Sequence, residues 1–170
     1  MPCRVRNHTI TYIDRTDPVA VRLDGLGFDG FPGEGEEVKD DIENIIVGAN
    51  HGDVLTCSSA SNDIRGLGGT ELIDGGHAAD TLDAGPGLDT VTYLDRTTDL
   101  AVSLDDVAND GATGELDNVA ADFENITGGP VATRWSVTLA ATSWRASRVA
   151  TYSGVSAVTI SSTVASVPTP

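Results

Sequence analysis

A nine-residue periodicity in the middle of the chain constrains the fold more than any other feature of the sequence. Residues 48–92 divide without a gap into five blocks of nine: GANHGDVLT, CSSASNDIR, GLGGTELID, GGHAADTLD and AGPGLDTVT. The sixth place of each block holds an oxygen-bearing side chain, in order Asp53, Asn62, Glu71, Asp80 and Asp89. The eighth place holds an aliphatic side chain, in order Leu55, Ile64, Ile73, Leu82 and Val91. A potential metal ligand and a potential core residue therefore recur at a fixed spacing.

These blocks match the nonapeptide Gly-Gly-x-Gly-x-Asp-x-U-x, in which U is aliphatic. The stretch therefore resembles the RTX, or haemolysin-type calcium-binding, repeats. The resemblance implies an all-β fold, a parallel β-roll or β-solenoid built from nonapeptide coils. In such a fold the early glycines of each block allow a tight turn, and the residues around the eighth place form a short strand with its apolar side chain inward. Two blocks make one coil.

Side chains eighteen residues apart would then stack along the same edge of the roll. One edge would carry Asp53, Glu71 and Asp89, and the other Asn62 and Asp80. Like charges on neighbouring strands repel, so a column of carboxylates implies a cation. Carboxylates with turn carbonyls favour Ca²⁺ over a soft metal, and in the resembled family the sixth-place acid supplies such a ligand. The candidate calcium-site residues are Asp53, Asn62, Glu71, Gly76, Asp80, Gly85, Gly87 and Asp89.

The five blocks match the pattern unevenly. The second block lacks glycine and offers the neutral Asn62, and the third offers the longer Glu71. The turns that lead to Asp80 and Asp89 come closest to the pattern. Because glycine and aspartate are common in any loop, the alternative is an acidic solenoid whose turns hold water and no ions.

The charge of the chain limits its partners. Its formal net charge of -16 speaks against nucleic acid or an anionic membrane surface, since both would repel it. No apolar run is long enough to span a bilayer, and the first residues contain arginines but no apolar signal-peptide core. Proteins of the resembled family leave bacterial cells through an uncleaved C-terminal signal. The resemblance therefore implies an extracellular protein.

A duplicated unit flanks the nonapeptides. Residues 10–48 and 91–129 align without a gap at an offset of 81 residues, or nine nonapeptides. Each copy is expected to form a strand around Tyr12 or Tyr93 and a second strand at residues 19–23 or 100–104. A hairpin turn should follow at Asp29-Gly30 in the first copy and at Asn109-Asp110-Gly111 in the second. A single coil strand should then cover residues 38–45 or 119–126.

The sequence therefore divides into four segments: the first copy of the unit (10–48), the calcium-binding nonapeptides (49–90), the second copy (91–129) and an atypical tail (131–170). Every acidic residue lies at or before Glu124. One hypothesis is a frameshift near Pro130 that replaced further repeats with out-of-frame residues. The alternative is a Ser/Thr-rich linker or edge strand, and an irregular or disordered tail is expected. The chain also begins inside a repeat with no cap before Ile10, which suggests a fragment of a longer protein.

Other polar residues support simpler interpretations. The neighbouring pairs Asp14-Arg15 and Asp95-Arg96 are expected to form surface ion pairs, not a catalytic site. Asp110 and Glu115 are either ordinary hairpin residues or ligands of a further Ca²⁺. The three histidines, His8, His51 and His77, share no chelating spacing and are expected to lie exposed in turns.

The sequence contains no Gly-x-Ser-x-Gly elbow, zinc-protease motif, P-loop or dinucleotide fingerprint, so this chain is not expected to be an enzyme by itself. Calcium-induced folding of a secreted binding module is the leading hypothesis. One alternative is the calcium-binding part of a larger secreted hydrolase or glycan-active enzyme. Another is a metal-free structural or adhesive solenoid.

Overall fold

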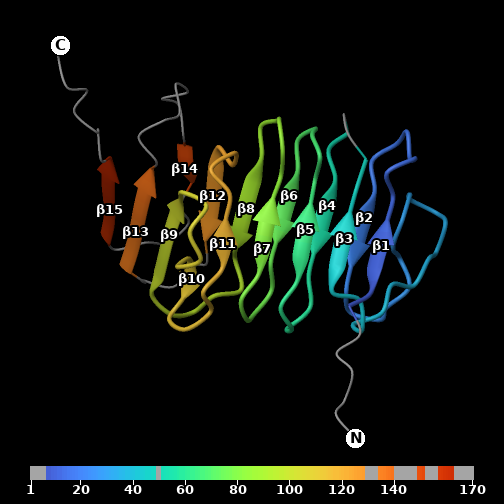
Figure 1. Ribbon diagram of the computed structural model, residues 1–170, viewed down its shortest axis with the longest axis horizontal. Coiled ribbons are helices and arrows are strands. Elements are labelled where there is room, and N and C mark those ends of the chain that lie inside the picture. The colour runs from blue at the N-terminus through green and yellow to red at the C-terminus, as the bar shows by residue number, and fades with distance from the viewer. Residues whose placement is uncertain (1–6, 49–50, 129–133, 140–148, 152–156, 163–170) are drawn as a thin grey trace, which may run out of the picture.

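The computed structural model describes residues 7–48, 51–128, 134–139, 149–151 and 157–162 (Figure 1). These residues form fifteen strands and no helix, and most strand pairs are parallel. The expected all-β class is confirmed. The described part of the chain has no helix that could cross a membrane.

Short strands alternate between two parallel sheets through the repeat region. They are β3 (Asn44–Ile46), β4 (Val54–Thr56), β5 (Asp63–Arg65), β6 (Leu72–Asp74), β7 (Thr81–Asp83) and β8 (Thr90–Tyr93). The odd-numbered ones belong to a five-stranded sheet and the even-numbered ones to a six-stranded sheet. Thr81 pairs with Asp63, and Thr90 with Leu72. Neighbours within a sheet are therefore two nonapeptides apart.

The core lies between these sheets and is built from the eighth-place side chains. Leu55, Ile64, Ile73, Leu82 and Val91 are all buried. Each of these residues has its strand neighbours on the opposite face, because side chains alternate along a strand. In β4 and β6 the first residue is exposed and the middle one buried. The result is a thin core that receives one aliphatic side chain from each nonapeptide.

Equivalent strands of the two copies of the duplicated unit lie in different sheets. In the first copy β1 (Thr9–Thr11) pairs with β3 in the five-stranded sheet, and β2 (Ala20–Arg22) pairs with β4 in the other. In the second copy β8 pairs with β12 (Asn125–Gly128) in the six-stranded sheet. The offset of nine nonapeptides explains the exchange, since an odd number of alternating blocks ends on the opposite sheet.

The prediction of a single strand over residues 38–45 or 119–126 is wrong. In the second copy β11 (Asn118–Val119) ends before a turn, and β12 begins only at Asn125. In the first copy β3 begins at Asn44, after a turn that contains Asp41. Asp122 lies in the turn between β11 and β12, where its carboxylate accepts a hydrogen bond from the N–H of Gly85 in place of a sheet ladder.

The hairpin in the second copy differs from the expected one. Asp110 pairs with Asp117 in an antiparallel bridge, and Gly111 begins β10 (Gly111–Ala112), which runs antiparallel to β9 (Leu100–Leu104). Asp110 and Gly111 therefore lie at the start of β10 instead of forming the turn.

The tail contains three strands: β13 (Arg134–Leu139), β14 (Val149–Thr151) and β15 (Ala157–Ser162). β13 pairs in parallel with β9 and with β15, and β14 with β12. The expectation of an irregular tail is therefore wrong for these segments, whose valine and threonine content suits a pleated sheet. The remaining tail residues, 131–133, 140–148, 152–156 and 163–170, lie outside the described structure. The expected disorder of these residues therefore stays a prediction.

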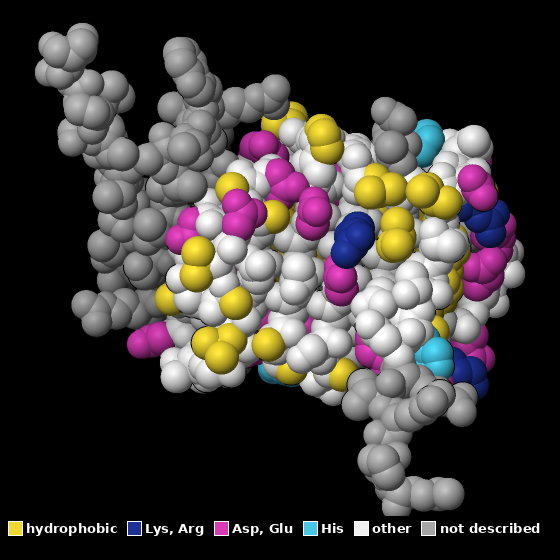
Figure 2. All heavy atoms as spheres, viewed as in Figure 1, with side chains coloured by type: hydrophobic (Ala, Val, Ile, Leu, Met, Phe, Trp, Pro, Cys, Tyr) yellow, Lys and Arg dark blue, Asp and Glu magenta, His cyan; other side chains and the backbone are white. Residues whose placement is uncertain are grey.

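The strands from β1 to β8 follow sequence order along the molecule, with β1 and β2 at one end and β13 and β15 at the other, and β9 lies beside β13 (Figure 1). Figure 2 shows acidic side chains spread over much of the described surface on the viewed face, with few basic ones. Part of the acidic charge therefore lies on this face, whereas other acidic residues, such as Asp53 and Asp80, are buried.

Candidate metal site

The sixth-place side chains of the nonapeptides are buried at the edges of the two sheets. Their exposed fractions are 2% for Asp53, 4% for Asn62, 1% for Glu71, 1% for Asp80 and 0% for Asp89. Each residue comes immediately before a strand, two positions ahead of the inward aliphatic. Because side chains two apart on an extended chain share a face, the strand that places the aliphatic in the core also turns the acid inward.

Sixth-place residues eighteen apart are directly linked, as the sequence predicted. The backbone N–H of Glu71 donates to Asp89 Oδ1 at 2.8 Å, and that of Asn62 donates to Asp80 Oδ1 at 2.8 Å. Asp53 lies on the same edge as Glu71, because its carbonyl accepts from the N–H of Leu72 at 2.9 Å. The structure thus assembles one column from Asp53, Glu71 and Asp89 and a second from Asn62 and Asp80.

Each acidic residue in these columns keeps buried oxygens without a hydrogen bond. They are Asp53 Oδ2, Asp80 Oδ2, Asp89 Oδ2 and both Oε atoms of Glu71, none of which has a partner among the described residues. A buried polar atom that lacks a partner is destabilising and is uncommon in folded proteins. Unpartnered acceptors that recur at the same place in successive repeats are the feature that a bound cation would satisfy.

Burial also disfavours the charged form of these acids. It raises the pKa of Asp80 to about 8. It raises the pKa of Glu71 to about 8 as well, with a further contribution from its neighbour Asp89. The pKa of Asp53 is raised by the same loss of solvent. Without a cation, Asp80 and Glu71 retain protons near neutral pH, and a divalent ion would favour their ionised form.

Glycines bring main-chain oxygens close to the columns. A Cβ atom at Gly87 would lie 2.5 Å from the carbonyl oxygen of Gly69 and 2.6 Å from both carboxylate oxygens of Asp89. No side chain fits there, and carbonyl and carboxylate oxygens face the same small space. Gly76 and Gly85 have φ angles of 77° and 85°, a region that favours glycine.

The donor set suits a hard cation. The described residues include no group of three or more His, Cys, Asp or Glu side chains that could hold a metal ion. An ion at either column would therefore need carbonyl or water oxygens in addition to carboxylates. Calcium accepts such mixed oxygen ligands, whereas zinc sites are usually built from several His and Cys side chains. The residues fit Ca²⁺ in chemical type.

The duplicated unit adds two acids to the columns that the sequence did not identify. Asp117 is fully buried, and its Oδ1 accepts from the N–H of Asp80 at 3.0 Å. Glu124 Oε2 accepts from the N–H of Asp89 at 3.0 Å. Neither acid falls on a sixth place of the nonapeptide phase, so the period did not select them. The offset of 81 residues between the two copies could have selected them, because acidic residues, Glu36 and Glu43, occupy the matching positions of the first copy.

The expected ion pairs Asp14-Arg15 and Asp95-Arg96 do not form as predicted, because each arginine pairs with a glutamate from the hairpin. Arg15 Nη1 lies 2.7 Å from Glu34 Oε1, and Arg96 Nε lies 2.7 Å from Glu115 Oε1. The second pair is buried, since Arg96 is only 4% exposed. The hairpin brings each glutamate back over the strand end, and sequence adjacency could not indicate this.

Asp110 has a structural role in the hairpin. Its two carboxylate oxygens accept from the N–H groups of Ser103 and Val119 and so hold the two sides of the loop together. Asp29 makes the equivalent bonds in the first copy. Glu115 is likewise engaged, with Arg96 and His77. These contacts favour the structural interpretation of Asp110 and Glu115 over a further calcium site.

The histidines are not grouped. The side chains of His8 and His77 are 40% and 66% exposed, as expected, and each lies near one glutamate, Glu43 and Glu115 respectively. His51 is half-buried and takes part in a parallel bridge with Gly69, so the expectation of an exposed turn is wrong for this residue.

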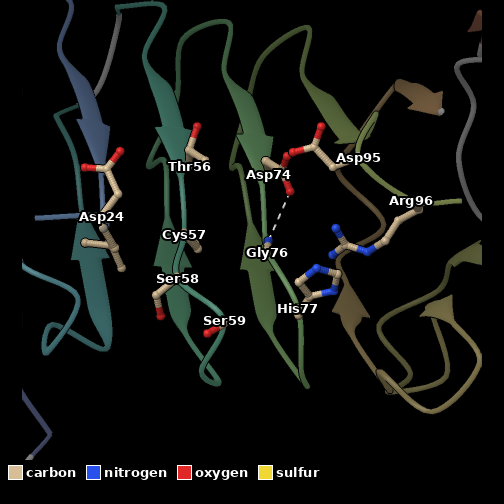
Figure 3. A pocket seen from close by; sticks show the side chains of 11 residues that line it. Asp24, Thr56, Cys57, Ser58, Ser59, Asp74, Gly76, His77, Asp95 and Arg96 are labelled. Carbon is tan, nitrogen blue, oxygen red and sulfur yellow. Dashed lines mark hydrogen bonds between the residues drawn. The ribbon is translucent and has the colours of Figure 1, made fainter. Parts of the chain in front are cut away.

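A cavity of about 280 Å³ lies beside the columns, and Figure 3 shows the side chains that line it. Asp74 and Asp95 point toward one another, and Arg96 and His77 lie near them, below in the view, whereas Asp24 lies at the far end. Burial raises the pKa of Asp74 above its ordinary value, and the hydrogen bond from Gly76 and the charge of Arg96 oppose this rise. The mixed charge of this lining distinguishes the cavity from the carboxylate columns.

Comparison of the chain with protein-family models, with curated proteins and with solved structures finds no match.

Proposed function

We propose that the chain is a secreted calcium-binding module of the RTX type, in which ions join successive coils of a β-roll. The observation that carries the proposal is the set of sixth-place residues, all buried, whose acidic members keep unpartnered carboxylate oxygens. Asp53, Glu71 and Asp89 would contribute ligands along one edge. Asp80 would do so along the other, with Asn62 as a neutral oxygen donor.

Calcium would supply the positive charge that these columns lack. Without it, Glu71 and Asp89 place two acidic groups side by side in a buried position, and the thin core offers limited compensation for chain entropy. The ligands come from different repeats, so the site forms only when the coils are assembled. Binding free energy then becomes folding free energy. Such coupling would keep the module unfolded at the low calcium of the cell interior and fold it outside.

The first test is far-UV circular dichroism of the purified chain during a Ca²⁺ titration from chelated buffer, with Mg²⁺ as the control ion. The proposal expects a cooperative gain of β signal with Ca²⁺ and little change with Mg²⁺, which dehydrates reluctantly and requires near-ideal octahedral geometry. A β spectrum that is fully formed in chelator and indifferent to Ca²⁺ would contradict it.

Isosteric variants locate the response. Asp80→Asn and Asp89→Asn keep side-chain shape and remove charge, and each should shift the Ca²⁺ midpoint at least tenfold upward. Asp63→Asn is the matched control, because Asp63 faces outward from β5 and pairs with Arg65 at the surface. Equal midpoints for all three variants would show that the columns are not the binding site.

A metal-free structural role is the second candidate. One oxygen each of Asp53, Asp80 and Asp89 already accepts a backbone hydrogen bond, so the columns contribute to strand stacking without an ion. Folding in chelator, with no calorimetric heat on Ca²⁺ addition, would favour this role.

A further inference from the structure

The two copies of the duplicated unit bury equivalent side chains to very different extents. The Arg96 side chain is 4% exposed, whereas its counterpart Arg15 is 40% exposed. Glu115 is 10% exposed and its counterpart Glu34 is 32% exposed. One apolar position follows the same trend, since Val91 is fully buried while Ile10 is half-buried, whereas Val38 is buried much as its counterpart Val119 is. The same unit therefore has a covered surface in one copy and an open one in the other.

Nonapeptide strands provide the cover in the second copy. β8 pairs in parallel with β6, and the N–H of Thr90 donates to the carbonyl of Glu71 at 2.8 Å. β11 pairs in parallel with β7, and the N–H of Asn118 donates to the carbonyl of Asp80 at 2.7 Å. A third bond runs from the N–H of Gly85 to Asp122 at 2.6 Å.

The corresponding positions in the first copy are Thr9, Glu37 and Asp41, each 81 residues earlier, and all three are exposed. Among the described strands, β1 is the last of its sheet. The carbonyl of His8 and the N–H of Tyr12 bond to the β3 side. Backbone N–H and C=O groups of successive residues point to opposite sides of a strand. The N–H and C=O groups of Thr9 and Thr11 therefore point away from β3. We call the surface formed by Thr9, Thr11, Glu37 and Asp41 the open end.

We infer that the open end binds two parallel strands of nonapeptide-repeat sequence from a partner polypeptide, in the register that β6 and β7 adopt on the second copy. Unpaired strand edges readily accept added strands, and the second copy identifies the chemistry of the occupant. The partner strands would place an aliphatic residue against Ile10, as Ile73 lies beside Val91, and another against Val38, as Leu82 lies beside Val119.

An intact second copy of the chain does not offer such strands, because its own β6 and β7 are paired on both sides within their sheets. The expected partner is therefore a polypeptide with unpaired nonapeptide strands. This binding does not require that calcium occupies the columns.

The test uses the full chain, with its β spectrum verified in Ca²⁺ or, if it folds there, in chelator. The probe is a fluorescent peptide with the sequence of residues 66–87, and its anisotropy reports binding. The expected result is saturable binding of one peptide per chain. A control peptide in which Ile73 and Leu82 are replaced by Asn should bind at least tenfold more weakly, because it lacks both inward aliphatics.

Two substitutions at one position localise the interaction. Thr9→Pro removes the outward N–H and should weaken binding about tenfold, the expected scale for a lost backbone hydrogen bond with added steric conflict. Thr9→Val keeps the N–H and should bind like the parent chain. Glu37→Pro repeats the test at the second strand if Thr9→Pro alters the β spectrum.

Three results would overturn the inference. One is the absence of peptide binding to a chain whose β spectrum is intact. Another is unchanged binding in both proline variants. The third is a dimer in sedimentation velocity, without peptide, that Thr9→Pro dissociates, since the occupant would then be a second copy. The Ca²⁺ titration of Asp89→Asn reports separately on the proposed function, so the two ideas can fail independently.

Discussion

At the scale of single residues, successive repeats approach one another closely at Gly87, which lies near the acid Asp89. The backbone of Gly87 is in contact with the carbonyl of Gly69 and the carboxylate of Asp89, and it leaves no room for a methyl group. Gly27 also has an ordinary φ, but a Cβ atom there would meet nothing closer than 3.7 Å. These two glycines form a matched pair in which only the contacts differ.

We therefore predict that Gly87→Ala destabilises the chain by about 1–3 kcal/mol, the usual cost of overpacking. Gly27→Ala should be close to neutral. Urea unfolding at saturating Ca²⁺ measures both free energies of unfolding. A similar loss in the two variants would show that the contacts at Gly87 relax without cost.

The buried acids predict an unusual pH dependence for the metal-free chain. The pKa of Asp80 in the folded state is about 8, well above the ordinary aspartate value of about 3.9 that applies to the unfolded chain. The folded state therefore binds more protons than the unfolded state between these pH values. The contribution of Asp80 to the stability of the fold is fully present below about pH 4 and is lost as the pH rises through 8.

The β signal of the chain in chelator, measured by circular dichroism, should accordingly decrease as the pH rises from 5 to 8, and Asp80→Asn should flatten the profile. On the proposed function, Ca²⁺ would compete with protons for the same oxygens, so its affinity should rise over this range. A β signal in chelator that increases with pH would contradict the prediction.

At the scale of elements, the duplicated unit shows how position changes the value of an interaction. Its hairpin pairs an arginine with a glutamate in both copies, but within the part of the chain that the structure describes, preceding strands cover only the second pair. A buried ion pair is strongly destabilised when one partner is removed, whereas an exposed pair contributes little.

Arg96→Gln should therefore destabilise the chain by about 3–5 kcal/mol, because it leaves Glu115 buried and uncompensated. Arg15→Gln should have little effect. Thermal unfolding of both variants in parallel tests the difference, and equal unfolding temperatures would indicate that the second copy is not covered in solution.

The elements also show where sequence reasoning failed. The alternation around Val21 and Val102 correctly predicted the second strand of each unit. The Asp-Gly pair at Asp110 suggested a hairpin turn, but the carboxylate bonds to backbone on both sides of the loop and places the pair at the start of β10. Local turn statistics contain no information about such bonds between segments.

At the scale of the whole molecule, the net charge of -16 opposes compaction. Monovalent salt screens this repulsion, so we predict that 0.5 M NaCl raises the β signal of the chain in chelator. Calcium should produce a larger gain at concentrations at least a hundredfold lower, because it acts at defined positions. Circular dichroism of the two titrations compares them directly. Equal potency of the two salts would indicate screening alone.

The sequence alone determined the repeating part of the fold, because a nine-residue period assigns every residue of a block to turn, edge or core by local geometry. It predicted that Leu82 is in the core and that Glu71 and Asp89 share an edge. Only the tertiary structure decided that Asp117 extends a column and that Glu115 pairs with Arg96. These contacts join segments 19 to 37 residues apart without a common period, so they depend on how the hairpin folds back against the repeats.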